Sequence, residues 1–222
     1  MTRLNKTFTD LKFPNNNPKD WKTGQSKNSK SLFTVIGASN HAEGERQKYD
    51  YYATDPKCAT DLLSVEEFSN NIWEPACGEG HLSRQILMLK NRENPNANVY
   101  SSDIIDRGFG DVKDFLNLEI QQWNGDIITN PPYKYAQEFV EKSLQIIPEG
   151  NKVAMFLKLT FLEGQKRKEM FRLNPPKTLY VYSKRQMCQK NGEFEKYKGS
   201  AIAYCWYVWE KGFKGDTKIK WL

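Results

Sequence analysis

Residues 130–133 read Asn-Pro-Pro-Tyr and combine an amide, two prolines and an aromatic ring. They follow the apolar pair Ile127 and Ile128, so we expect Asn130 at the carboxyl end of a strand. Successive prolines fix the backbone and lack N–H groups, so the turn offers hydrogen-bond acceptors, to which Asn130 adds a side-chain carbonyl. Fixed acceptors suit the N–H groups of an aromatic amine and make its lone pair more available. Tyr133 adds a flat face on which a base can stack, worth roughly 1–3 kcal/mol.

Asn-Pro-Pro occurs a second time, at residues 174–176. This copy follows "EMFRL", whose spacing is helical, and Lys177 stands where the first copy has its tyrosine. Because the residue before a proline disfavours helix, the second copy predicts the end of a helix rather than a site.

The stretch "EPACGEGH", residues 74–81, lies between an expected strand and an expected helix. Gly78 and Gly80 permit positive φ and a close approach of the backbone to a ligand. A dinucleotide site would have a third glycine where Ser83 stands, and a phosphate-binding P-loop would have a lysine. Glu74, placed before the glycines, suits a cationic amine better than a pyrophosphate. A purely structural turn is the alternative.

Asp103 ends the next expected strand, "ANVYSSD". Its distance in sequence from the glycine turn is about that at which a strand-end carboxylate meets ribose hydroxyls. The alternative is an aspartate that caps the following loop.

Strands and helices alternate along the chain from residue 50 onward. Strands are expected at "NNIWE", "ANVYSSD", "DIIT", "NKVAMFLKLTFL", "TLYVYS" and "AIAYCWYVW", and helices at "KCATDLLSVEEF", "HLSRQILMLKNR", "AQEFVEKSLQII" and "EGQKRKEMFRL". This alternation predicts an α/β fold with a mostly parallel, doubly wound sheet. The last two strands have a polar loop between them, and we expect them to form an antiparallel pair at the sheet's edge.

Charge is distributed unevenly over the 222 residues. Residues 1–31 have a net charge of +5, residues 32–150 one of −9, and residues 151–222 one of +10. Basic ends around an acidic middle favour a polyanionic partner, although blocks of like charge are often simply solvated. We expect residues 1–31 to be a poorly ordered basic arm, and residues 32–222 to be one domain.

Several classes of protein are disfavoured by the composition. The sequence has neither an apolar run long enough to span a membrane nor an apolar block of a signal peptide at its start. The four cysteines are dispersed and the histidines number two, so we expect no metal site. Reduced thiols and a cytoplasmic location are the plain expectation.

With these motifs in view, residues 40–212 resemble the S-adenosylmethionine-dependent amino-methyltransferases. The chain is most similar to the small adenine-N6 DNA methyltransferases of phages and mobile elements. The resemblance implies a Rossmann-like methyltransferase fold with S-adenosylmethionine as cofactor. It assigns catalysis to Asn130, Pro131, Pro132 and Tyr133. It assigns cofactor binding to Tyr52, Thr54, Glu74, Ala76, Gly78, Gly80, Asp103, Asp114, Phe115 and Asn130, with Asp114 accepting the cofactor's adenine amino group and Phe115 beside its ring.

The resemblance also implies that an adenine flips out of DNA into this pocket. Larger family members carry a recognition domain that is not evident here, so we expect DNA contacts from a basic loop and the N-terminal arm. The expected phosphate contacts are Lys166, Arg167, Lys168, Lys184 and Arg185. Phe161 or Met187 are candidates for the second face of the base, although core packing is the commoner role of such residues.

The sequence thus predicts methyl transfer to adenine N6 in DNA by a monomer or weak dimer. Three alternatives stay open. The same motif suits transfer to RNA or to a glutamine amide of a protein. A nucleic-acid-binding protein without catalysis is the third, although the intact Asn-Pro-Pro-Tyr disfavours it.

Overall fold

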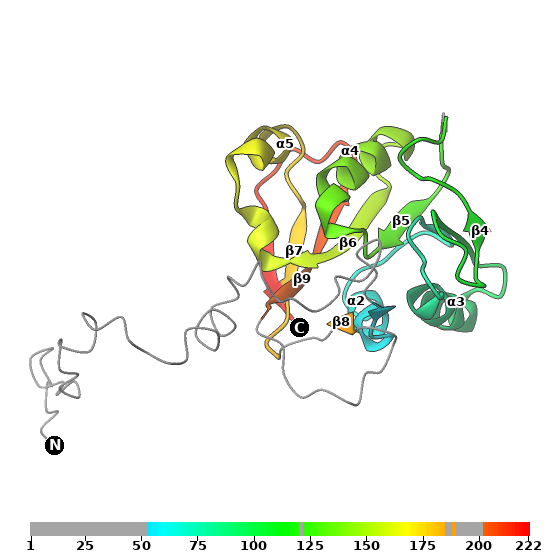
Figure 1. Ribbon diagram of the computed structural model, residues 1–222. Helices are drawn as coiled ribbons and strands as arrows, with labels where there is room; N and C mark the ends of the chain where they lie inside the picture. Colours follow the sequence, from blue (N-terminus) through cyan, green and yellow to red (C-terminus); the bar gives the residue numbers. More distant parts are fainter. Residues whose placement is uncertain (1–52, 120–121, 185–187, 190–201) are drawn as a thin grey trace, which may run out of the picture. The chain divides into compact units, whose positions relative to one another are not determined.

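The computed structural model describes residues 53–119, 122–184, 188–189 and 202–222 (Figure 1). The expected arm at residues 1–31, together with Tyr52, Arg185 and Met187, lies outside these ranges. The strands are β1 (Ala53–Thr54), β2 (Asn71–Glu74), β3 (Asn98–Asp103), β4 (Asp111–Val112), β5 (Asp126–Thr129), β6 (Lys152–Lys158), β7 (Thr178–Val181), β8 (Cys188–Gln189), β9 (Tyr204–Glu210) and β10 (Lys218–Trp221). The α-helices are α2 (Lys57–Leu63), α3 (His81–Glu93), α4 (Ala136–Ile146) and α5 (Lys168–Leu173).

Eight strands form one sheet in the order β10-β7-β9-β6-β5-β2-β3-β4. Of the described strands in this sheet, β9 alone runs antiparallel to its neighbours. The chain leaves β2 toward β3 on one side and reaches β5 on the other, as doubly wound sheets do. The predicted α/β class, with a mostly parallel doubly wound sheet and an antiparallel pair near the C-terminus, is confirmed.

The position of the antiparallel pair differs from the expectation. β9 lies between β6 and β7, rather than at an edge, and β10 pairs in parallel with β7 as the outer strand. The aromatic strand β9 is almost entirely buried, which explains why it occupies the interior of the sheet. No strand was predicted at residues 218–221, which are all exposed in the structure.

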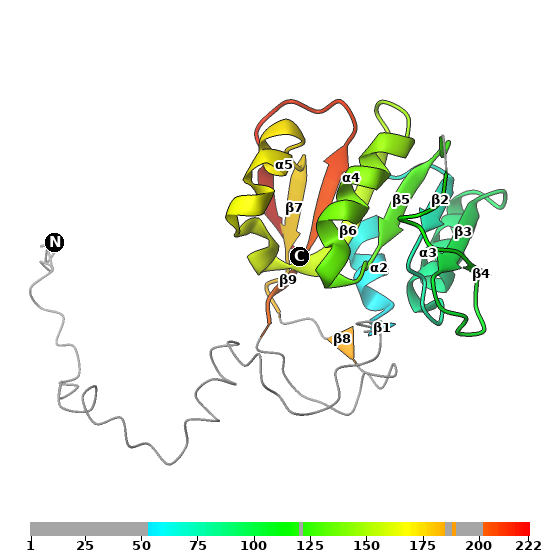
Figure 2. The ribbon, with the colours of Figure 1, turned by 45° about the horizontal axis from the view of Figure 1, so that its top comes forward.

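Helices cover both faces of the sheet (Figure 2). One core contains apolar side chains of α4 and α5 against odd-numbered positions of β6 and β9, such as Val153 and Tyr207. The second contains side chains of α2 and α3 against the even-numbered positions, such as Phe156 and Trp206. A strand presents alternate residues to opposite faces, so continuous apolar runs in β6 and β9 serve both cores.

Asp126 joins three strands at their amino ends. Its buried carboxylate accepts hydrogen bonds from the backbone N–H of Ser69, from Lys152 N at 2.7 Å and from Asn151 Nδ2 at 2.9 Å. These donors precede or begin the neighbours of β5 in the sheet. The register of β5 against β2 and β6 is thereby set at one end, which aligns the opposite, carboxyl ends.

The ends of β6 and α5 can be compared with the ends that the sequence predicts. β6 ends at Lys158, earlier than expected, and Leu159–Leu162 form a 3₁₀ helix. The second Asn-Pro-Pro is a helix end as predicted: α5 stops at Leu173, and Asn174 N donates to Met170 O at 2.8 Å. No described helix is long and apolar enough to cross a membrane.

Gly80 begins α3 with φ +80°, a conformation that favours glycine. A Cβ at this position would lie 2.3 Å from the ring of Phe109. The Phe109 ring is itself covered by the Arg84 guanidinium, 4.4 Å from its centroid. The second glycine of the turn is therefore required by packing as well as by backbone geometry.

Replacing Gly80 with alanine should destabilise the fold. The left-handed backbone costs a non-glycine residue roughly 1–2 kcal/mol, and the overlap with Phe109 adds to this cost. Gly108 is the matched control, because it has φ +75° but open space around its added Cβ. We expect Gly80→Ala to lower the free energy of unfolding in urea more than Gly108→Ala; equal losses would show that Phe109 gives way without cost.

Candidate active site

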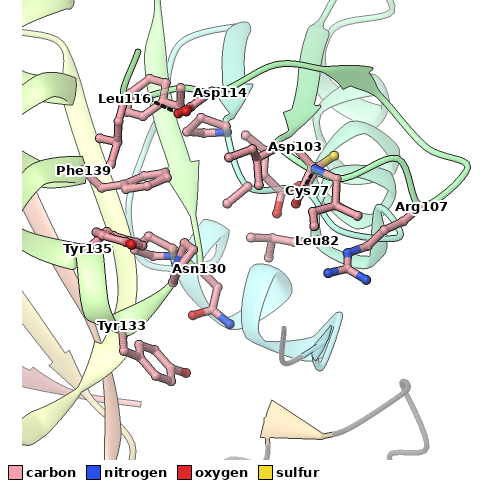
Figure 3. A pocket seen from close by; sticks show the side chains of 18 of the residues that line it. Cys77, Leu82, Asp103, Arg107, Asp114, Leu116, Asn130, Tyr133, Tyr135 and Phe139 are labelled. Atoms are coloured by element: carbon pink, nitrogen blue, oxygen red, sulfur yellow. Dashed lines mark hydrogen bonds between the residues drawn. The ribbon is translucent and has the colours of Figure 1, made fainter. Parts of the chain in front are cut away.

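A cavity of about 670 Å³ opens at the carboxyl ends of β2, β3 and β5 (Figure 3). Ligands of open α/β sheets bind at this place, next to the point where the strand order reverses. Predicted site residues from five separate segments meet here. Those that line the cavity are Thr54, Glu74, Ala76, Asp103, Asp114, Phe115, Asn130, Pro131, Pro132 and Tyr133.

Gly78 and Gly80 are not among the residues that line the cavity. Gly78 instead donates its backbone N–H to Asp103 Oδ2 at 2.8 Å, across the two neighbouring strands. Gly80 packs beneath Phe109, as described above. Both glycines therefore shape the turn, while other residues of the same turn, such as Ala76 and Cys77, line the cavity.

Asp103 holds two loops together at the end of β3. Besides Gly78, Ile105 donates its backbone N–H to Asp103 Oδ1 at 3.0 Å. The residue is 9% exposed and faces the cavity. Each carboxylate oxygen retains acceptor capacity, so both interpretations of this aspartate are compatible with its geometry: it caps the loop and can accept from a ligand's hydroxyl groups.

Glu74 is a buried acid at the end of β2, 2% exposed. The Ser83 hydroxyl donates to its carboxylate, and the hydroxyl of Ser101 lies 2.7 Å from that of Ser83. Burial raises the pKa of Glu74 to about 8, helped by the negative charge of Asp103, and the Ser83 hydrogen bond opposes the rise only in part. Among the described residues no basic side chain forms an ion pair with its carboxylate, and a cationic ligand in the cavity would supply that charge.

Asn130 follows β5 and its side chain is held from a second segment. Its Nδ2 donates to Thr54 Oγ1 at 2.8 Å. Thr54 belongs to β1, which pairs antiparallel with β8, so the Asn130 amide is tied to the two-stranded sheet as well as to β5. Pro131 is buried and Pro132 partly so, and Figure 3 shows the Asn130 side chain directed toward the cavity.

Tyr133 begins a 3₁₀ helix, Tyr133–Tyr135, that leads into α4. The Lys158 ammonium lies 4.9 Å from the centroid of its ring, and the ring of Tyr204 lies 6.0 Å away at 35°. The tyrosine is half-buried, and its side chain marks the lower end of the cavity in Figure 3.

At the other end of the cavity, Asp114 and Phe115 have different surroundings. The Asp114 carboxylate accepts from the backbone N–H of Leu116 at 3.1 Å and from the Asn117 side chain, so it shapes its own turn. The Phe115 ring packs edge-on against Trp73, with centroids 5.1 Å apart, and against Phe139. Phe115 thus joins the wall of the cavity to the core.

The residues expected to contact nucleic acid differ in their surroundings. Lys166, Lys168 and Lys184 are exposed, and Arg185 lies outside the described residues. Arg167 is different, because its guanidinium donates to the backbone carbonyls of Phe161, at 2.8 Å, and Glu163. Only its remaining donors are left for a phosphate.

Phe161 is a core residue, as its type favours. It is 8% exposed, packs edge-on against Tyr207 with centroids 5.5 Å apart, and does not line the cavity. Cys77 lines the cavity, but burial raises the pKa of its thiol to about 12, so it is not a nucleophile.

Three further residues that line the cavity were not predicted: Ile104, Ile105 and Arg107. They belong to the loop after β3, between Asp103 and Gly108. Their position directly after a strand-end acid could have indicated a role in the site, since loops at the carboxyl ends of strands form the sites of such sheets. Arg107 places a cation at the mouth of a cavity that contains three acids (Figure 3).

The described residues contain no cluster of three or more histidines, cysteines or acids that could hold a metal ion. The lining of the cavity has two chemically different parts. Acids and apolar groups line the ends of β2 and β3, and a rigid set of acceptors follows β5. This arrangement can hold an elongated, partly cationic ligand with one end near Asn130.

The raised pKa of Glu74 predicts how the stability of the ligand-free protein varies with pH. The folded pKa of about 8 exceeds the ordinary value of 4.5, so the folded state binds the Glu74 proton more tightly than the unfolded state does. The stabilisation that this proton contributes is present in full below pH 4.5 and is lost as pH rises through 8. The free energy of unfolding should fall by about 1 kcal/mol per pH unit across this window.

Urea unfolding of wild type and Glu74→Gln at several pH values measures this effect. Glutamine keeps the shape and removes the titration, so the variant's profile should be flatter. Other titrating groups cancel in the difference between the two proteins. Parallel profiles between pH 5 and 8 would contradict the proposed protonation of Glu74.

The sequence and the structure were compared with those of known proteins. No protein-family model and no curated protein matches the sequence. A Listeria monocytogenes protein assigned as a class I S-adenosylmethionine-dependent methyltransferase superposes with a TM-score of 0.57 at 11% identity, over 86% of this chain and 71% of that one. A Pyrococcus horikoshii protein assigned as an RNA methyltransferase gives 0.51 at 16%, over 82% and 98%.

Subunits of restriction-modification enzymes are also similar. The M protein of the type I restriction enzyme EcoKI superposes with a TM-score of 0.52 at 11% identity, over 75% of this chain and 45% of that one. A modification subunit assigned to a type I restriction enzyme of Vibrio vulnificus gives 0.52 at 14%, over 79% and 46%. This chain therefore spans about half the length of these two relatives. At such identities the likeness concerns architecture, and the chain has the Rossmann-like fold found in S-adenosylmethionine-dependent methyltransferases.

Proposed function

We propose that the protein transfers a methyl group from S-adenosylmethionine to the N6 amino group of adenine in DNA. The observation that carries the proposal is the convergence of Glu74, Asp103 and Asp114 with Asn130-Pro131-Pro132-Tyr133 around one cavity. The parallel pairing of the strands brings their carboxyl ends to one edge of the sheet, but it does not dictate which residue types stand there. A site for a cationic adenosyl ligand beside a site for an amine explains this combination of residue types.

The residues fit the cofactor chemically. Asp103 has acceptor capacity for ribose hydroxyls, and Asp114 with the apolar Ile104 and Phe115 suits an adenine ring. Glu74 is a buried acid with no basic partner in the part of the chain that the structure describes, which suits the cationic methionine end. The cavity volume is within the range of roughly 300–1,000 Å³ that is typical of small-molecule sites. The cofactor supplies an electrophilic methyl group on a cationic sulfur.

In the proposed reaction Asn130 and the Pro131 carbonyl accept the two N–H groups of the target amine. This orients the nitrogen lone pair and directs it at the methyl group. As the N–C bond forms, the bond between the methyl group and sulfur would break and its electron pair would stay on the sulfur as a neutral thioether. The nitrogen becomes acidic and its proton leaves to solvent, so no general base is needed beforehand. Alignment supplies much of the rate gain, because fixed geometry replaces the entropy cost of a bimolecular encounter.

Basic residues are concentrated at both ends of the sequence, which favours a nucleic acid over a protein amide as the acceptor. DNA is favoured within that class because restriction-modification subunits are among the similar structures. The adenine must flip out of the duplex to reach the cavity, at an unstacking cost of a few kcal/mol.

RNA is the second candidate, favoured by the similar protein assigned as an RNA methyltransferase. Tritiated methyl transfer with plasmid DNA and transcribed RNA in competition separates the two. Mapping the methylated positions in plasmid DNA from a host without adenine methylation then gives the recognition sequence. Incorporation into RNA alone would reject the DNA assignment.

Asn130→Ala should abolish methyl transfer and leave S-adenosylmethionine affinity nearly unchanged, since the lost amide orients the acceptor amine. Thr54→Val should have an intermediate effect, because it removes the hydroxyl that accepts from Asn130 Nδ2 while preserving shape. Activity is measured by tritium incorporation and affinity by calorimetry. Near-normal turnover in Asn130→Ala would reject the mechanism.

Affinity for S-adenosylmethionine should increase with pH. Glu74, with its pKa of about 8, must lose a proton before it can pair with a cation. The Kd should therefore fall up to about tenfold per unit from pH 6 toward pH 8, and level off above it. Calorimetry in buffers of different ionisation enthalpy should detect proton release.

Glu74→Gln is the control and should make the affinity independent of pH in this window. S-adenosylhomocysteine keeps the ammonium group but lacks the sulfonium charge. The same pH dependence with this ligand would assign the pairing to the ammonium, and its loss would assign it to the sulfonium. A wild-type Kd that stays constant from pH 6 to 8 would remove Glu74 from cation binding.

A further inference from the structure

Lys158 is the last residue of β6, the strand next to β5. Its ammonium lies 4.9 Å from the centroid of the Tyr133 ring. The backbone position is fixed, because Lys158 pairs with Tyr204 of β9 and its carbonyl accepts from the Tyr207 hydroxyl at 3.2 Å. A rigid strand end therefore holds a flexible cation against the aromatic residue of the Asn-Pro-Pro-Tyr turn.

Within the described part of the chain, no carboxylate pairs with Lys158. The lysine at the opposite end of the same strand shows the contrast: Lys152 Nζ lies 2.6 Å from Glu66 Oε1. Lys177 is paired as well, with Glu210. Lys158 is half-buried at the carboxyl edge of the sheet, so its charge is partly shielded from water without an acidic partner.

A cation over an aromatic ring is a weak interaction that an anion can readily outcompete. Aromatic faces together with lysines are what single nucleotides require, since bases stack and phosphates seek positive charge. A base that stacks beside Tyr133 has its own phosphates only a few ångströms away. Lys158 is long enough to leave the ring and meet one of them.

We propose that Lys158 binds a DNA phosphate next to the flipped adenine, while Tyr133 contacts the base. This inference rests on the proposed function and specifies its substrate class. A neutral glutamine amide in a protein would give the lysine no partner, whereas every nucleotide brings one. Lys158 is thus a positioning residue for the substrate strand and not a catalytic one.

The test compares Lys158→Met with Lys158→Arg and with a matched control, Lys220→Met. Lys220 lies on β10, also places its ammonium over a tyrosine ring, 5.5 Å from the centroid of Tyr180, and is exposed. Tyr180 does not line the cavity. Both methionine variants remove one positive charge and one cation–ring contact, so they differ in their place and in the burial of the lysine.

Initial rates of methyl transfer to unmethylated plasmid DNA are measured at subsaturating DNA over a series of NaCl concentrations. The slope of log(kcat/KM) against log[NaCl] reports phosphate contacts in the productive complex, at about 0.7–0.9 per contact. Lys158→Met should make the slope shallower by about this amount and raise the KM for DNA at least several-fold. Lys158→Arg should keep the wild-type slope, and Lys220→Met should change neither quantity.

Calorimetric affinity for S-adenosylmethionine should be the same in all four proteins, which also verifies folding of the site. An unchanged slope in Lys158→Met, or an equal change in Lys220→Met, would overturn the inference while leaving the proposed function intact. If wild type binds the cofactor but methylates RNA with the same lysine dependence, the phosphate contact holds and the DNA acceptor is rejected. Failure of wild type to methylate either nucleic acid rejects the proposed function itself.

Discussion

The parallel pairing of β2 with β5 is the constraint on which the site depends. Trp73 is opposite Ile127 in this pair, so Glu74 at the end of one strand and Asn130 beyond the end of the other reach the same edge of the sheet. Asp126 fixes the arrangement from the opposite edge by accepting from both neighbours of β5. A buried carboxylate with three donors is costly to disrupt, because loss of any donor leaves charge unsatisfied in the interior.

Local pattern was enough to predict the order of strands and helices, and hence the doubly wound sheet. Glycines, prolines and strand-end acids also indicated which turns face the cavity, since the carboxyl ends of parallel strands converge. The insertion of β9 between β6 and β7 was beyond local pattern, because a buried antiparallel strand and a buried parallel one have similar sequences. The strand β10 was not predicted, although residues 218–221 alternate between polar and apolar types; all four are exposed in the structure.

Long-range contacts limited the prediction of individual roles. Gly80 was expected to approach the ligand, yet its neighbour is Phe109, a residue nearly thirty positions away. Arg167 is spaced like its neighbours Lys166 and Lys168, but only the fold shows that backbone carbonyls occupy part of its guanidinium. Lys158 could not be distinguished from other lysines, because its significance lies in the ring it covers and in the carboxylate that Lys152 has and it lacks.

The hydrogen bond between Thr54 and Asn130 connects three parts of the molecule. Thr54 pairs in β1 with β8, which belongs to the segment between β7 and β9, and Asn130 belongs to the turn after β5. Because Thr54 lies in β1, the orientation of the Asn130 amide depends on the position of β1 as well as on that of β5. The two prolines fix the backbone of the turn, so the Asn130 side chain is the part of the turn that this hydrogen bond orients.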